Sequence, residues 1–228
     1  MDLTSEDTQQ LNYLIEWVNA RVDELLPNGQ TPEAPIGYIE EELDNSALYI
    51  LRTINKQIGY SACKTADASA LTVTDNPDND TTLVGCPEDY VRFMRIRMAG
   101  WKRAIDQLIS VDSNRYRQQS NRFLQGNTHK PTAFLVPSGT AASGMAIEVS
   151  PGGEVTEFIY VPRLRAFQMP KDLQDPMIWL TAARTLTILR QGTLAQSAMY
   201  NMQLSMSQLR VGMYGEEVRQ QPANEADS

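Results

Sequence analysis

Apolar residues in the first 58 positions recur every three or four residues, and this spacing predicts two amphipathic helices. The first spans about residues 4–26 and the second about residues 36–58. Their apolar positions are Leu11, Leu14, Ile15, Val18, Val22 and Leu25, then Ile36, Ile39, Leu43, Leu51, Ile54 and Ile58. Thr4 or Ser5 can cap the first helix, because a side-chain hydroxyl accepts from a free N–H group of the first turn. Gly59 is a typical helix stop.

The pattern then changes between residues 60 and 85. Residues 70–74 and 81–84 are rich in threonine, valine and leucine, which is typical of strands. The Asp, Asn and Pro residues at 75–80 favour a turn between them. This region is therefore expected to be a hairpin or loop inserted between helices.

A third long helix is predicted from Pro87 to about Ile109. Proline suits the first position of a helix, and Glu88 and Asp89 follow in the first turn, where the helix dipole favours carboxylates. The apolar positions of this helix are Val91, Met94, Met98, Trp101, Ile105, Leu108 and Ile109. A shorter helix is expected over residues 114–124.

Strands are predicted after residue 131, at 133–136, 145–149 and 155–161. Pro151-Gly152-Gly153 is expected to form a hairpin turn between the last two. Helical spacing returns over residues 174–190 and 194–213.

These elements predict an α+β fold, mainly a helical bundle with an inserted small antiparallel β module. The expected organisation begins with a helical part over residues 1–130, interrupted by the hairpin or loop at 60–85. An antiparallel β module at 131–165 and a C-terminal helical hairpin at 166–215 follow, and a polar, flexible tail is expected over 216–228.

Composition indicates a folded chain, since 42% of the 228 residues are hydrophobic and 21% are charged, close to the globular average. The net charge of −8 argues against a free nucleic-acid binder, which normally carries a basic excess. No apolar run approaches the roughly 18 residues that a membrane span needs. The first residues also lack the features of a signal peptide, so the chain is expected to fold in a cytoplasm without contacting a membrane.

No pattern predicts a catalytic residue, a metal ligand set or a cofactor. The single histidine, His129, lies in a loop without a nucleophile motif beside it. Residues 75–80 lack the central glycine and terminal glutamate of a calcium loop. Cys63 and Cys86 are expected to be free thiols, with a disulfide as the alternative.

The densest carboxylate cluster comprises Glu40, Glu41, Glu42 and Asp44. Consecutive helical residues point about 100° apart, so these carboxylates cannot converge on one ion without ligands from elsewhere. A solvated or partner-facing acidic edge is the favoured interpretation.

Charge is distributed unevenly along the chain. Up to residue 48 the only basic residue is Arg21, and the acidic residues are Asp2, Glu6, Asp7, Glu16, Asp23, Glu24, Glu33, Glu40, Glu41, Glu42 and Asp44. Between 90 and 130 the basic residues are Arg92, Arg95, Arg97, Lys102, Arg103, Arg115, Arg117, Arg122 and Lys130, against Asp106 and Asp112. Acidic and basic regions in one chain can pair between copies, and such heterologous contacts close into rings when the rotation fits. Two ordinary solvated faces are an equal alternative.

Within that basic region, Arg92, Arg95, Arg97, Lys102 and Arg103 are predicted to contact a neighbouring subunit or DNA in a channel. The last helix is rich in methionine, which suits adaptable surfaces as well as cores. Core packing is the default interpretation for Met199, Met202 and Met206, and contact with a neighbouring subunit or a portal protein is the functional one.

The order of these segments resembles the head–tail connector or adaptor ring proteins of tailed bacteriophages, and most of all a ring protein of crAss-like phages. The resemblance rests on the run Cys86-Pro87-Glu88-Asp89-Tyr90-Val91-Arg92-Phe93, on Trp101-Lys102-Arg103, on residues 116–121, on Pro131 and on Phe158-Ile159-Tyr160-Val161-Pro162. It implies a ring of about twelve copies around a bore that passes packaged DNA, bound to the portal protein and to other tail or ring proteins. The implied location is the head–tail junction of a virion that is assembled in the cytoplasm of a bacterial host.

Two other functions stay open from the sequence. A soluble DNA-associated or regulatory binding protein would use residues 92–122 and would lose affinity steeply with salt. A hydrolase built from scattered carboxylates is the third and least supported hypothesis.

Overall fold

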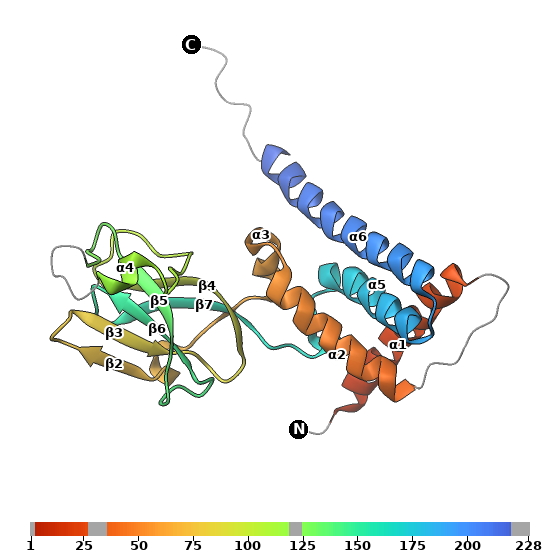
Figure 1. Ribbon diagram of the computed structural model, residues 1–228, viewed down its shortest axis with the longest axis horizontal. Coiled ribbons are helices and arrows are strands. Elements are labelled where there is room, and N and C mark those ends of the chain that lie inside the picture. The colour runs from red at the N-terminus through yellow and green to blue at the C-terminus, as the bar shows by residue number, and fades with distance from the viewer. Residues whose placement is uncertain (1–2, 27–35, 119–124, 220–228) are drawn as a thin grey trace, which may run out of the picture. The chain divides into compact units, whose positions relative to one another are not determined.

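The computed structural model describes residues 3–26, 36–118 and 125–219, and it has the α+β fold that the sequence predicts (Figure 1). The chain divides into two compact units. The helical unit comprises Met1–Ser61 and Leu164–Ser228, and the β unit comprises Ala62–Arg163. The β unit is therefore an insertion between the two halves of the helical unit.

The helical unit begins with α1 (Ser5–Leu25), α2 (Ile36–Thr53) and the single turn α3 (Lys56–Gly59). After the β unit it continues with the short 3-10 turn η4 (Ala166–Gln168), α5 (Lys171–Ile188) and α6 (Gly192–Arg219). Thr4 caps α1 in a capping box, since its Oγ1 accepts from Asp7 N at 3.1 Å and Asp7 Oδ2 accepts from Thr4 N at 3.0 Å.

Helix α5 is the centre of the helical unit. Helices α1, α2 and α6 all pack against it, whereas α1 and α2 touch each other much less (Figure 1). Its buried residues are Leu173, Pro176, Met177, Ile178, Trp179, Leu180, Thr181, Ala182, Ala183, Thr185 and Leu186. A helix that is buried around most of its circumference needs apolar residues on every side, and this is why α5 lacks a single apolar stripe.

The β unit contains two antiparallel sheets (Figure 1). The three-stranded sheet has the order β1-β7-β4 and the four-stranded sheet the order β2-β3-β6-β5. The strands are β1 (Lys64–Thr65), β2 (Val73–Asn76), β3 (Thr81–Gly85), β4 (Tyr90–Met98), β5 (Thr132–Pro137), β6 (Met145–Ser150) and β7 (Val155–Pro162). The short turns η2 (Tyr60–Ala62), η3 (Ala68–Ala70) and α4 (Asn114–Arg117) complete the described elements.

The two sheets share one apolar core. Phe93 and Ile96 of β4 and Phe158 of β7 enter it from one sheet, and Ala133 of β5 and Ile147 of β6 enter it from the other. On the opposite face of the four-stranded sheet a smaller cluster is formed by Phe134, Val136 and Ala146, against which Ile109, Val111 and Tyr116 pack. Strands β3, β5 and β6 of the four-stranded sheet are therefore covered on both faces, whereas β2 is exposed.

The third long helix predicted from Pro87 to Ile109 is wrong. The segment forms strand β4 and then a loop, in which Ile96 and Ile105 exchange backbone hydrogen bonds of 2.8 Å. Val91, Met94, Met98 and Trp101 fit a helical spacing, but from Met94 to Met98 buried residues also alternate with the half-buried Arg95 and the exposed Arg97. Pairing with β7 decides between the two periods, and Gly100, with φ of 79°, turns the chain back after the strand.

The predicted domain boundaries differ from the observed ones as a consequence. The β module extends over Ala62–Arg163 instead of residues 131–165, so residues 1–130 are not one helical part. The predicted first helix, the two C-terminal helices, the inserted hairpin β2–β3 and the strands β5, β6 and β7 are confirmed. The helix predicted over residues 36–58 is divided into α2 and α3, with a break at residues 54–55. Helix α6 continues to Arg219, so the start of the predicted tail is helical, and residues 220–228 lie outside the described residues. Of the predicted helix at 114–124, only α4 is observed, and residues 119–124 also lie outside the described residues.

The predicted hairpin turn at residues 151–153 is also wrong. Strands β6 and β7 belong to different sheets, because β6 pairs with β3 and β5 whereas β7 pairs with β1 and β4. The connection is held to the hairpin β2–β3 instead. Gly152 N donates to Asp80 O at 2.9 Å, and Gly153 N donates to Thr82 Oγ1 at 3.0 Å.

We predict that Gly126→Ala destabilises the protein strongly. A Cβ at position 126 would lie 2.1 Å from the carbonyl oxygen of Ser150 and 2.8 Å from Thr132 Oγ1, so backbone must move to admit it. The expected loss is about 1–3 kcal/mol of unfolding free energy, measured as the midpoint of thermal or urea unfolding. Gly139→Ala is the control, because nothing lies within 4 Å of its added Cβ. Equal midpoints for the two variants would contradict the prediction.

Candidate interaction surfaces

The five basic residues predicted to make contacts lie on a strand and a loop, not on a helix. On β4, Arg97 is exposed and Arg95 places its Nε 3.3 Å from Glu157 Oε2 of the neighbouring strand β7. Arg92 is half-buried and lies near Cys63, where its positive charge opposes the rise in the thiol pKa that burial causes. These three arginines are therefore divided among different surroundings along the strand.

Lys102 and Arg103 belong to a second group of cations on the loops of the β unit. Arg103 and Arg115 line one open pocket of about 580 Å³, together with residues 104–110 and 131–133. Lys102 N donates to Thr128 O at 2.9 Å, which brings the segment that ends in Lys130 beside it. We call Lys102, Arg103, Arg115, Arg117 and Lys130 the basic loop surface.

The five residues of the basic loop surface are all exposed. Within the described residues none of them forms an ion pair, although Asp106 lines the same pocket. The β unit holds 11 Lys and Arg and 11 Asp and Glu, so it is neutral as a whole and basic locally at these loops.

Two carboxylates of the predicted acidic edge form ion pairs within the helical unit. Glu42 Oε2 of α2 lies 2.8 Å from Arg184 Nη1 of α5. Asp44 accepts from Arg165 Nη1 at 2.6 Å and from the backbone N–H of Ala166 at 2.9 Å, which ties α2 to η4. Glu41 is exposed and Glu40 is half-buried. The four carboxylates therefore do not act as one surface.

The net negative charge of the chain belongs to the helical unit. That unit has 17 Asp and Glu against 9 Lys and Arg, a difference that equals the net charge of −8 of the whole chain. Arg21, Arg165 and Arg184 pair with carboxylates of the unit itself, so its acidic excess lies in the carboxylates outside these ion pairs.

Helix α1 presents an aromatic and acidic surface to solvent. Tyr13 and Trp17 are 51% and 40% exposed, and their rings meet edge to face with centroids 6.0 Å apart. Glu16 is exposed one turn after Tyr13, and Asp23 is exposed two turns after Glu16 on the same side of the helix. Neither carboxylate forms an ion pair within the described residues. We call these four residues the α1 outer face. The sequence already indicates that Tyr13 and Trp17 are exposed, since both residues fall outside the apolar stripe of the helix.

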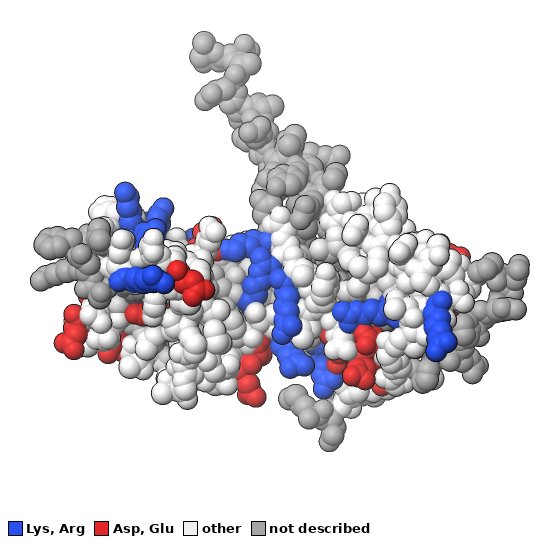
Figure 2. Space-filling view, viewed as in Figure 1, with Lys and Arg blue, Asp and Glu red and all other residues white. Residues whose placement is uncertain are grey.

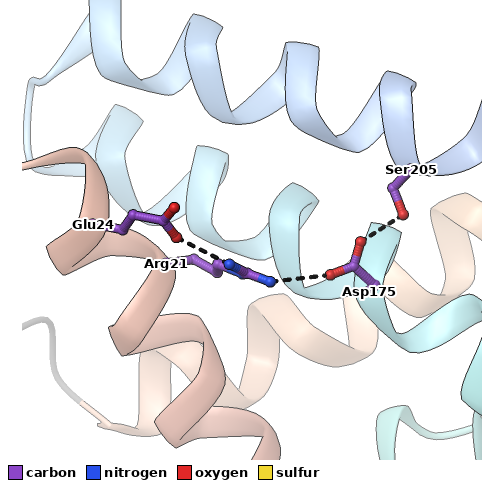
Figure 3. Close-up of polar contacts among 4 residues, drawn as sticks. All are labelled: Arg21, Glu24, Asp175 and Ser205. Carbon is purple, nitrogen blue, oxygen red and sulfur yellow. Dashed lines mark hydrogen bonds and ion pairs between the residues drawn. The ribbon is translucent and has the colours of Figure 1, made fainter.

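Behind that face, Arg21 joins α1, α5 and α6 (Figure 3). Its guanidinium lies 5.5 Å from the Trp17 ring centroid and 4.6 Å from that of Trp179. Arg21 also pairs with Glu24 at 2.9 Å and with Asp175 at 3.5 Å. Ser205 of α6 donates to the other oxygen of the Asp175 carboxylate at 2.6 Å.

Helix α6 contains the predicted methionines, which do not share one environment. Met202 is buried at 7% exposure, so it is a core residue, whereas Met199 and Met206 are half-buried. The opposite side of the helix leaves Tyr200 66% exposed and Leu204 45% exposed.

No charged residue occurs from Gly192 to Leu209. Figure 2 shows an uncharged area over this part of α6. We call the exposed residues Gln196, Tyr200, Gln203, Leu204 and Ser207 the α6 outer face.

The thiols and carboxylates form no metal-binding group among the residues that the structure describes. Cys63 and Cys86 form no disulfide, as the sequence predicts, and burial raises the pKa of the Cys86 thiol to about 12. This thiol is therefore protonated at neutral pH, and a protonated thiol is a poor nucleophile. No described helix is both long and apolar enough to span a bilayer.

We predict that Arg21→Ala lowers the unfolding free energy by about 1–3 kcal/mol, because it removes a cation stacked on two tryptophans and leaves Asp175 without its cation. Arg21→Lys should recover only part of this loss, since an ammonium group cannot stack as a planar guanidinium does. Urea unfolding followed by tryptophan fluorescence measures both. Arg52→Ala on the exposed surface of α2 is the matched control, and an equal loss in the control would contradict the prediction.

A scan against models of protein families found no match to this chain, and no curated protein sequence matches it.

Proposed function

We propose that this protein is a structural subunit of a virion, an adaptor ring protein that joins the portal to the tail and forms part of the DNA channel. Its partners are further copies of itself, the portal protein and other tail or ring proteins. The ring is assembled in the cytoplasm of the bacterial host and is located at the head–tail junction.

The α6 outer face is the observation that carries this proposal. A helix surface without charge over 18 residues, with exposed Tyr200 and Leu204, is unusual for solvent contact alone. The cores of protein–protein interfaces are depleted in charged residues and enriched in aromatic residues and methionine. Half-buried Met199 and Met206 border this face and can adapt to a partner.

The arrangement of the chain supports the same function. The resemblance implies a helical bundle with an inserted β module, and the β unit is inserted between α3 and η4 of the helical unit. Strands β1 and β7 pair through Lys64 and Tyr160, so the entry and exit of the insertion lie side by side. A module attached in this way leaves the helices free to build one bundle.

The net charge of the helical unit also suits the wall of a channel. DNA that passes through a bore must not bind tightly to it, and carboxylates repel phosphates. A net charge of −8 per copy gives a ring of about twelve copies a strongly negative potential.

The mass of the purified protein, measured by native mass spectrometry alone and with its virion's portal protein, tests the proposal. We expect a closed ring of about twelve copies on the portal, with interfaces larger than about 2,000 Å² as in obligate assemblies. A monomer or dimer that does not bind the portal would contradict the adaptor function.

We predict that Leu204→Glu weakens assembly or portal binding at least about tenfold, because a carboxylate would be buried without a partner at an uncharged interface. Leu3→Glu is the matched control, since Leu3 is also a leucine about half exposed, at 49% against 45%. Both variants should keep the circular dichroism spectrum of the parent. An equal affinity for the two variants would show that the α6 outer face is not a contact surface.

A further inference from the structure

Two exposed surfaces of this protein have complementary chemistry, and each lacks a partner of the opposite charge within the described residues. The α1 outer face belongs to the helical unit and combines Tyr13 and Trp17 with Glu16 and Asp23. The basic loop surface belongs to the β unit and contains the three arginines Arg103, Arg115 and Arg117. Every copy of the chain carries both.

The α1 outer face has the composition of an interaction hot spot. Tryptophan and tyrosine are the residues that most often dominate binding energy at protein interfaces. An exposed Trp17 in an edge-to-face pair with Tyr13 presents a rigid apolar anchor, and the exposed carboxylates of Glu16 and Asp23 follow one another two turns apart along the same helix. This combination requires a basic partner, since phosphate groups would be repelled.

Arginine is the cation that fits such a face best. A guanidinium group stacks on tryptophan and tyrosine rings and also donates two parallel hydrogen bonds to a carboxylate. Arg21 of this chain already makes the stacking contact, since its guanidinium lies over the rings of Trp17 and Trp179. Arg103 and Arg115 border one open pocket that can accept a projecting side chain.

We propose that the α1 outer face of one copy binds the basic loop surface of the next copy. The contact uses different surfaces of the two copies, so it is heterologous and leads to a closed ring when the rotation fits. This inference rests on the proposed function and names the surfaces through which the ring assembles. It assigns Tyr13, Trp17, Glu16 and Asp23 to one side and Arg103, Arg115 and Arg117 to the other.

A second copy explains the observations better than DNA does. DNA could occupy the basic loop surface, but it would leave the aromatic and acidic α1 outer face without a partner. The net charge of −8 also opposes the approach of a polyanion to the whole molecule. A second copy satisfies both surfaces at once and is a strongly acidic partner at its helical unit.

Reciprocal charge reversal tests this contact. The first variant carries Arg103→Glu and Arg115→Glu, and the second carries Glu16→Arg and Asp23→Arg. Each variant alone should require an at least about tenfold higher protein concentration to assemble, because like charges then face each other across the interface. An equimolar mixture should assemble again, since each reversed surface meets a reversed partner. Mass photometry of the full chain, at low and at high salt, measures the outcome.

The controls have the same change of charge at exposed positions elsewhere. Arg52→Glu with Arg163→Glu matches the first variant, and Asp78→Arg with Glu154→Arg matches the second. The controls should assemble like the parent. Recovery in the mixture cannot come from folding defects, because two misfolded chains would not restore each other.

The results separate this inference from the proposed function. A parent protein that never assembles, with or without the portal, contradicts both. A parent that assembles while both reversed variants assemble equally well overturns this contact alone. If the first variant assembles normally but loses binding to a labelled DNA duplex that the parent binds, the basic loop surface is a DNA contact and the inference is wrong.

Discussion

The burial of α5 is the constraint on which the helical unit depends. This helix is apolar around most of its surface, and α1, α2 and α6 must all pack on it to remove that surface from water. Since α1 and α2 precede the β unit and α5 and α6 follow it, the bundle forms only when the two halves of the chain meet. The pairing of β1 with β7 makes this possible, because it returns the chain to the place where the insertion began.

The packing of the helical unit also brings arginines and carboxylates of different elements together. In the helical unit Arg21, Arg165 and Arg184 each pair with a carboxylate of another helix or turn. Half-exposed ion pairs of this kind stabilise a fold by no more than about 1 kcal/mol each. The exposed Glu16 and Asp23 of α1 lie outside these pairs and form no ion pair within the described residues. The exposed cations of the basic loop surface likewise form no ion pair among the described residues, and the contact proposed above would pair the two surfaces across copies.

Sequence patterns indicated part of the candidate surfaces. Lys102 and Arg103 were expected to be available for contacts, and both are exposed, although on a loop instead of a helix. Glu42 and Asp44 were expected at an acidic edge, but their partners Arg184 and Arg165 lie more than a hundred positions away and could not be foreseen from local spacing. Met202 likewise fitted a surface or a core, and only the contact of α6 with α5 placed it in the core.

The sequence by itself determined the fold class, the helices of both chain ends, the inserted hairpin and the last three strands, because apolar spacing, β-prone residues and turn residues agreed in those segments. It did not determine the structure of residues 87–109, where apolar residues satisfy the period of a helix and the alternation of a strand together. Pairing of β4 with β7 decided for the strand, and in doing so it moved the boundary of the β unit to Ala62. The tertiary structure also decided which sheet each strand joined, since hydrogen bonds between distant strands leave no local pattern in the sequence.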